Sequence, residues 1–289
     1  MADPLRYGII LAASSDADRR AVSVADAPVR PTHVVVNLTK VGDDELVNAG
    51  FRLAAETRLR VIGLGEIPDR RDPADYGWIV DAKTRARVWT MAGRRGEHAG
   101  GGSKNRLIDE VITLPKGEYI AYYQTDGSHA YGDWNSEAPY DPDSWGLTIA
   151  GAGDDFNERN VTAFAPGEES GVIAQLIKAK DGSRLSRRFA LPAPTKVRVY
   201  AIGEGQSREM ADYGWITDAR TGRTVWEMTY GMTERAGGAK KNRLVDRVIT
   251  LEPGEYELHY ECDDSHAFND WNDDPPEDPV HWGISLYRE

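Results

Sequence analysis

The chain has 289 residues, which is enough for two domains that each bury a core. Its 40% hydrophobic and 28% charged residues are typical of a folded protein and exclude a disordered one. The formal net charge of −12 repels phosphate and anionic lipid, so we expect no nucleic-acid partner. No apolar run reaches the ~20 residues of a membrane helix, so we expect no membrane insertion.

The chain is an internal duplication. Residues 75–152 align without a gap with residues 212–289, and 40 of the 78 aligned pairs are identical. Further upstream the offset changes from 137 to 138 residues. All eight tryptophans fall into pairs at the 137-residue offset: Trp78 with Trp215, Trp89 with Trp226, Trp134 with Trp271 and Trp145 with Trp282. We therefore predict two repeated domains, residues 13–150 and 151–289, and an extra segment, residues 1–12.

The first predicted element is a strand in that extra segment. DPLRYGIILA at residues 3–12 resembles DPDSWGLTIA and DPVHWGISLY, the segments that end the two repeats. Its Tyr7, Ile9 and Leu11 would share one face of the strand. A strand without its own domain can pair with the open edge of a neighbouring molecule. We predict head-to-tail self-association through this assembly strand; the alternative is that it joins a sheet of the first domain.

The segments that follow alternate with period two, the pattern of half-buried strands. In TKVRVYAIG, Val197, Val199 and Ala201 face one side of the strand and Tyr200 faces the other. GWIVDAKTRARVW and GWITDARTGRTVW each predict a hairpin, and VITLPKGEYIAYY and VITLEPGEYELHY each predict two strands across a glycine-containing turn. The fold class we predict is all-β: two tandem antiparallel β-sandwiches of the jelly-roll kind, plus the extra N-terminal strand.

The motif DGSHAYGDWN near residue 126 returns as DDSHAFNDWN near residue 263. Ser128 and His129 are neighbours, so on an extended chain their side chains point to opposite sides and cannot form a nucleophile–base pair. No other nucleophile is supplied, and we predict no enzyme. The leading interpretation is a structural corner, in which His129 and His266 donate hydrogen bonds to neighbouring groups.

A calcium site is the alternative interpretation of this motif. Carboxylate and amide oxygens suit calcium, although their spacing is not that of an EF-hand loop. The candidate ligands are Asp126, Asp133, Asn135 and Asp141 in the first copy and Asp263, Asp270, Asn272 and Asp278 in the second. Calcium is the candidate cofactor, and none is required by the structural interpretation.

The single cysteine, Cys262, excludes an internal disulfide framework and a multi-cysteine zinc site. It shares one face of its strand with Tyr256, Leu258 and Tyr260, so we predict a buried thiol. The first residues carry too short an apolar core for a secretory signal. Both a cytoplasmic chain and one whose signal was removed fit this start.

The order of short motifs resembles bacterial pre-peptidase C-terminal domains, small β-sandwiches appended to secreted enzymes. The motifs are an F-x-L strand, a V-R-V strand, a W-I-x-D hairpin and I-T-L-x-x-G-E-Y, within Phe51 to Ile149 and Phe189 to Leu286. The tryptophan-rich tail from Asp126 onward lies outside the family pattern. The resemblance implies a non-catalytic accessory or binding module, and an extracellular or cell-surface location.

Together these patterns predict a non-enzymatic structural or interaction protein that self-associates head to tail through a donated terminal strand. The alternative is a calcium-dependent or carbohydrate-binding accessory module, whose partner would be a surface polymer. A solvent-exposed aromatic pair in each copy would favour the carbohydrate alternative, because aromatic rings stack on sugars. Full burial of all eight tryptophans would count against it.

Overall fold

The computed structural model describes residues 12–21, 30–69 and 72–289, and it divides into two compact units, residues 1–31 and 32–289. The predicted assembly strand with Tyr7, Ile9 and Leu11 lies outside the described residues. The described part of the first unit contains α1 (Asp16–Ala21), where Ser15 Oγ accepts a hydrogen bond from the Asp18 backbone at 3.1 Å, a helix N-cap contact. Among the described residues, no helix has the length and apolarity to cross a membrane.

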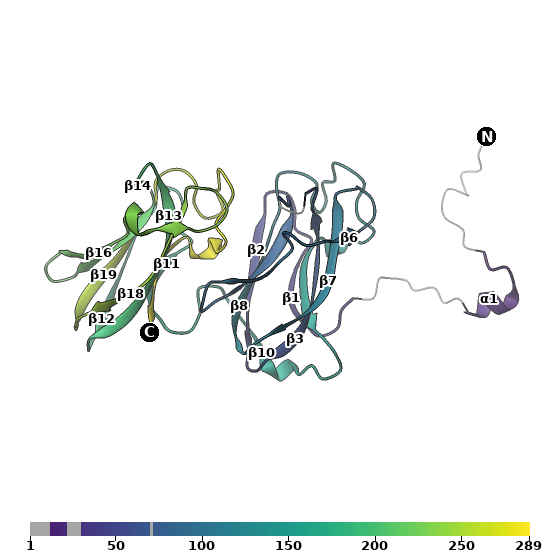
Figure 1. Cartoon of the computed structure of the whole chain (residues 1–289), viewed down its shortest axis with the longest axis horizontal. Coiled ribbons are helices and arrows are strands. Elements are labelled where there is room, and N and C mark those ends of the chain that lie inside the picture. The colour runs from purple at the N-terminus through teal and green to yellow at the C-terminus, as the bar shows by residue number, and fades with distance from the viewer. Residues whose placement is uncertain (1–11, 22–29, 70–71) are drawn as a thin grey trace. The chain divides into compact units, whose positions relative to one another are not determined.

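The second unit contains two β-sandwiches, which we call the first and second repeat (Figure 1). In the first repeat, one sheet has the order β1-β9-β3-β7-β6 and the other β10-β2-β8-β4-β5. The bounds are β1 (Val34–Thr39), β2 (Leu46–Leu53), β3 (Thr57–Glu66), β4 (Tyr76–Asp81), β5 (Arg87–Thr90), β6 (Glu97–His98), β7 (Asn105–Leu114), β8 (Gly117–Gln124), β9 (Gly146–Gly151) and β10 (Val161–Phe164).

The second repeat has the same plan, with sheets β11-β20-β13-β18-β17 and β12-β19-β15-β16, and with β14 paired to β13. The bounds are β11 (Val172–Ile177), β12 (Arg184–Leu191), β13 (Thr195–Gln206), β14 (Glu209–Met210), β15 (Tyr213–Asp218), β16 (Thr224–Glu227), β17 (Glu234–Arg235), β18 (Asn242–Leu251), β19 (Gly254–Glu261) and β20 (Gly283–Arg288). Short 3₁₀ turns lie at η2 (Pro142–Ser144), η3 (Glu158–Asn160), η4 (Tyr230–Met232) and η5 (Pro279–His281).

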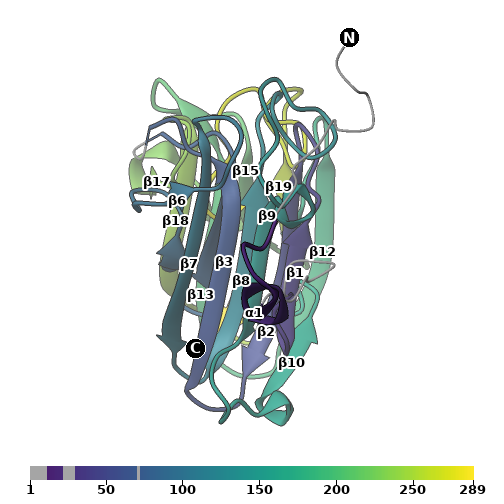
Figure 2. The same ribbon diagram turned by 90° about the vertical axis from the view of Figure 1, so that its right-hand side faces the viewer.

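The predicted all-β fold class is confirmed. Every ladder between the named strands is antiparallel, and apart from the hairpin pairs the chain crosses from one sheet to the other between successive strands, in the manner of a jelly roll. In Figure 2 strands β7, β3 and β1 of one sheet share one axis, with β7 antiparallel to β3. Both predicted hairpins form, as β4–β5 and β15–β16. The segments around Gly117 and Gly254 form two strands each, but these strands belong to different sheets, so the turn crosses the sandwich instead of closing a hairpin.

Each sandwich buries its own core between its two sheets. Phe51, Leu59, Ile79, Tyr123 and Ile149 are buried in the first core. The equivalent positions in the second core carry the same or similar residues. The connection after β9 returns to the first repeat, because β10 pairs with β2 as an edge strand. The first repeat therefore continues past residue 150, and the second begins its strands with β11 at Val172.

Tyr200 departs from the simple alternation. Val197, Val199 and Ala201 face the core of the second repeat, as their spacing predicts. Tyr200 lies on the opposite face of β13, yet it is only 3% exposed. Something other than its own sandwich must cover it.

Candidate functional site

The DGSHAYGDWN motif forms a corner that is tied to the scaffold. His129 is buried with φ near 63°, and its Nε2 donates to Asn105 Oδ1 at 2.6 Å. Asn105 in turn donates to the carbonyl oxygens of Gly100 and Glu137 at 2.9 and 3.1 Å. The second copy repeats the contact, from His266 Nε2 to Asn242 Oδ1 at 2.6 Å. Burial lowers the pKa of both imidazoles, that of His266 to about 4. The geometry is that of a structural corner.

A buried aspartate anchors each corner. Asp75 accepts hydrogen bonds from the Asp126 backbone at 2.9 Å and from Trp145 Nε1 at 3.2 Å. Asp212 makes the equivalent bonds in the second copy, at the same distances. Burial raises the pKa of Asp75 to about 8 and that of Asp212 to about 7. Neither aspartate is among the predicted site residues, although both are the D of the shared DYGWI.

The structure does not gather the eight predicted calcium ligands. Asp126 and Asp263 each accept a hydrogen bond from a serine backbone two residues on, as in a local turn. Lys104 and Lys241 donate to Asn135 and Asn272. Asp133 and Asp270 are exposed, Asp141 accepts from Ser144, and Asp278 lies in a different, buried network. Within the described residues, no three His, Cys, Asp or Glu side chains stand together in a geometry that could hold a metal ion.

Two of the predicted ligands, Asp126 and Asp270, do line one cleft. The cleft has a volume of about 1090 Å³ and is lined by residues from both repeats, among them Trp271. Its acidic lining residues are Asp44, Glu45, Glu66, Asp72, Asp126, Asp270, Asp273 and Asp274. Lys104 pairs with Glu66 at 2.9 Å and neutralises part of this charge. The remaining carboxylates give the cleft a negative potential that attracts cations.

The repeats meet through an apolar face of the first one. We call the side of the β10-β2-β8-β4-β5 sheet that points away from its core the outer face. Its buried members are Trp78, Val80, Ala82, Ile120, Tyr122 and Phe164, and they form one cluster with Val280 of the second repeat. Trp78 Nε1 donates to the Glu277 carbonyl at 2.8 Å, and Arg87 pairs with the Glu277 carboxylate at 3.4 Å. The second repeat therefore covers this face.

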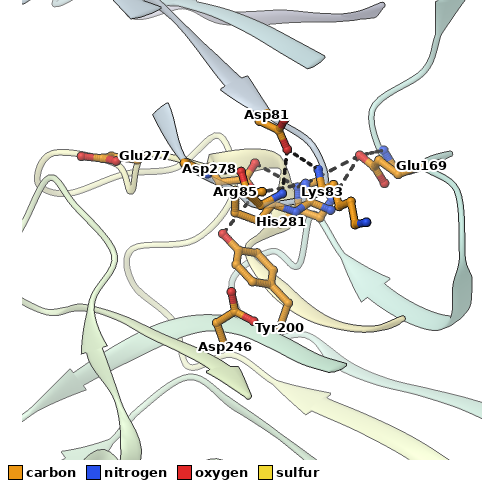
Figure 3. A network of polar contacts seen from close by, with 12 residues as sticks. Asp81, Lys83, Arg85, Glu169, Tyr200, Asp246, Glu277, Asp278 and His281 are labelled. Carbon is orange, nitrogen blue, oxygen red and sulfur yellow. Dashed lines mark hydrogen bonds and ion pairs between the residues drawn. The ribbon is translucent and has the colours of Figure 1, made fainter. Parts of the chain in front are cut away.

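Arg85 extends from the turn between β4 and β5 into a polar socket, which consists of Glu169, Tyr200, Asp278, His281 and Tyr287. Figure 3 shows Arg85 among the first four of these groups. Its Nη1 lies 3.3 Å from Asp278 Oδ2 and 3.2 Å from His281 Nδ1, and its Nη2 donates to the Tyr287 hydroxyl. The guanidinium also lies 5.1 Å from the Tyr200 ring centroid. The Arg85 side chain is only 3% exposed, so the socket encloses it, and Arg85 in turn covers the Tyr200 ring.

The charges in the socket balance. His281 pairs with Asp278 at 2.9 Å and with Glu169 at 3.3 Å. Burial alone would raise the pKa of Glu169, but the hydrogen bond and charge of His281 and the charge of Arg85 hold it to about 2. His281 and Arg85 outweigh burial in the same way and hold the pKa of Asp278 far below its ordinary value. Burial and Arg85 would lower the pKa of His281, but the two carboxylates raise it overall. Two cations face two carboxylates, an arrangement that a buried site tolerates.

The Arg85 backbone has an energetically unfavourable conformation, and the contacts of its side chain in the socket offset this energy. Its φ is 62°, the left-handed region that costs a side-chain-bearing residue about 1–2 kcal/mol. The equivalent residue of the second repeat is Gly222, with φ near 70°, for which the same turn is free of strain. Glycine would suit the first turn too. An arginine in this unfavourable backbone conformation indicates that its side chain has a structural role.

Identities between the repeats do not reveal the socket. The contact depends on positions where the repeats differ: Arg85 against Gly222, and Tyr200, His281 and Tyr287 against Ile62, Ser144 and Ala150. Another signal was the continuous apolar run YIAYY at 119–123, where the second repeat alternates as YELHY. A strand buried on both faces reads as such a run.

Fold and site define an all-β protein of two jelly-roll repeats joined by a buried ionic contact. No family model matches the chain, and no curated protein matches it. Among solved structures, it is similar to the CUB1-EGF-CUB2 domain of human MASP-1/3, with a TM-score of 0.26 and 10% identity over 87% of this chain and 96% of that one. It is also similar to the CUB1-EGF-CUB2 domains of rat MASP-1, with a TM-score of 0.25 and 11% identity over 86% and 93%.

Proposed function

We propose that the chain is a non-enzymatic interaction protein whose two β-sandwich repeats act as one unit. The observation that carries this proposal is the enclosure of the Arg85 side chain by the second repeat, together with the covered outer face of the first. A buried ionic contact holds its partners in one relative arrangement, because removing either partner leaves an unpaired buried charge. A fixed pair of sandwiches suits a protein that presents surfaces to a partner.

The placement of the histidines supports a non-catalytic role. His129, His266 and His281 are each at most 1% exposed, and each bonds to the scaffold or to the socket. A general base must reach a substrate proton. The rings of these three imidazoles do not face solvent, so they cannot accept a proton from a bound substrate.

Self-assembly through residues 1–12 is part of the proposal. These residues resemble the segments that form β9 and β20, and each of those strands lies inside its sheet, between β1 and β3 or between β11 and β13. Since both central places are filled, a donated strand would add to an edge. β12 ends its sheet, whereas β10 covers the equivalent β2. Arg184, Arg187 and Arg188 on β12 are charges of the kind that limit strand addition.

Light scattering and electron microscopy of the full chain, beside a variant without residues 1–12, test the assembly. We expect oligomers or fibres of the full chain and a monomer of the truncated one. Monodisperse monomers in both samples would remove self-assembly from the proposal and leave a binding module.

Calcium binding is the second candidate, and the acidic cleft with Asp126 and Asp270 favours it. Calorimetric titration of calcium chloride into the full chain is the test, with the D126N/D270N variant as the comparison. Heat of binding in the wild type that the variant loses would support calcium. No heat in either protein would end this candidate.

A further inference from the structure

Three rings form a line on the second repeat, on the side of the β12-β19-β15-β16 sheet that points away from its core. Tyr213 and Trp215 have ring centroids 5.4 Å apart, and Trp215 and His259 have centroids 4.9 Å apart with planes 8° from parallel. Trp215 and His259 face each other in register across β15 and β19. All three residues are partly exposed. We call Tyr213, Trp215 and His259 the aromatic platform.

The same line exists in the first repeat, where it is covered. Tyr76 and Trp78 have centroids 5.3 Å apart, and Trp78 and Tyr122 have centroids 5.1 Å apart. Trp78 is 2% exposed and Tyr122 is fully buried, because Val280 and its neighbours lie on them. The ring geometry is therefore a property of the sheet and does not depend on the cover. In the second repeat the same ring geometry is present although no other segment among the described residues covers it.

The surroundings of the platform are polar where those of the covered line are apolar. Thr217 stands in the place of Val80 and Glu257 in the place of Ile120. Glu257 Oε1 accepts from Ser186, and Thr217 Oγ1 lies 3.0 Å from His259 Nε2. An apolar protein surface, or a second copy docking as the second repeat docks on the first, would take the Glu257 carboxylate out of water with no gain of a new cation. Such an occupant does not fit.

Carboxylates outnumber cations near the platform. Arg184 pairs with Glu261 at 3.0 Å, and Arg188 lies opposite Glu257 in the register of β12 and β19. Glu227 lies opposite Trp215 in the register of β15 and β16, so an anionic ligand is disfavoured there. Trp215 and His259 stack on each other, which leaves their outer faces and edges and the Tyr213 ring for the apolar C–H groups of a pyranose. Carboxylate, hydroxyl and imidazole groups beside them can bond to its hydroxyls. The flat sheet suits an extended chain of such rings.

We propose that the aromatic platform binds a linear neutral polysaccharide. This inference rests on the proposed function, since it names the substrate class of a non-catalytic module. Trp215 is the central stacking residue, and Tyr213 and His259 extend the contact to adjacent sugar rings. Glu257 accepts hydrogen bonds from the sugar hydroxyls.

Native gel electrophoresis of the full chain in gels that contain hydroxyethylcellulose or barley β-glucan tests the platform. We expect at least one polymer to retard the wild type, and W215A to lose most of that retardation. Y140A is the matched control, because Tyr140 is an aromatic residue that is 86% exposed and lies outside the platform. Y140A should migrate as the wild type does.

Equal retardation of W215A and Y140A, or no retardation of the wild type in either gel, would overturn the inference. Urea unfolding of W215A separates the two proposals, because the Arg85 socket does not involve Trp215 and the variant should unfold close to the wild type. An unchanged contact between the repeats with no glycan binding would leave the proposed function standing and remove only this inference.

Discussion

Strands β8 and β19 hold the same place in the two repeats, yet β8 is buried on both faces and β19 on only one. Tyr119, Ala121 and Tyr123 of β8 face the first core, and Ile120 and Tyr122 face the second repeat. On β19 the outward positions carry glutamates and His259 instead. The two sheets share the order of their four corresponding strands, and a few differing outward residues make one sheet an internal contact and leave the other open.

The matching end of the first repeat shows the same divergence. Val280 and His281, which meet the outer face of the first repeat, correspond to Asp143 and Ser144. Lys40 pairs with Asp143 at 3.0 Å. Polar residues in these places do not suit a second contact of the same kind. The first repeat therefore lacks, at this end, the residues with which the second repeat makes the contact.

Exchanging outward residues between β8 and β19 should give the largest effect. I120E places an unpaired carboxylate in the covered cluster, and we expect a loss of about 5 kcal/mol in the free energy of unfolding. E257I, the reverse exchange, changes an outward side chain on the open sheet and should cost less than about 1 kcal/mol. Urea denaturation of both variants measures the difference. Equal losses would contradict the assignment of the two faces.

Arg85 and Gly222 offer the next comparison. R85M keeps the strained turn but leaves Asp278 and Glu169 with one cation fewer, at an expected cost of about 4 kcal/mol. G222R introduces the strain without a socket and should cost about 1–2 kcal/mol. K83M is the control, because Lys83 is exposed in the same turn. If R85M unfolded like K83M, the socket would contribute no stability.

The socket should also make stability depend on pH. The folded pKa of His281 is raised, so its contribution is complete below the unfolded pKa and is lost as the pH rises through the folded value. Asp75 and Asp212 change stability in the same range, so the informative quantity is the difference between wild type and H281Q. We expect about 3 kcal/mol at pH 5, decreasing toward pH 9. A difference that is constant with pH would contradict a charged His281.

Cys262 should give the smallest effect. The thiol is buried and free, as its strand pattern predicts, and burial raises its pKa. Thr125 holds the equivalent place in the first repeat, where its hydroxyl contacts the Gly42 carbonyl. C262T should therefore cost no more than about 1 kcal/mol in urea denaturation. A larger loss would show that the two strands differ inside the cores as well as outside them.

The sequence predicted the fold class, both hairpins and the buried thiol, because alternation and turn residues report on local structure. It also paired the tryptophans, but Trp78 and Trp215 occupy different environments, one covered and one partly exposed. That difference depends on which surface of the other repeat lies nearby. The strained Arg85 and the apolar run around Ile120 carried part of this information. Nothing in the sequence indicated the role of Glu169, because its approach to His281 depends on the path of the chain between the repeats.

Residual dipolar couplings of the full chain measure whether the two repeats keep one fixed arrangement. If the Arg85 socket holds the repeats as one unit, the backbone couplings of β1–β9 and of β11–β20 will fit one alignment tensor. The R85M variant should then require two. Two different tensors for the wild-type repeats would show that they move independently and that the Arg85 socket does not fix them.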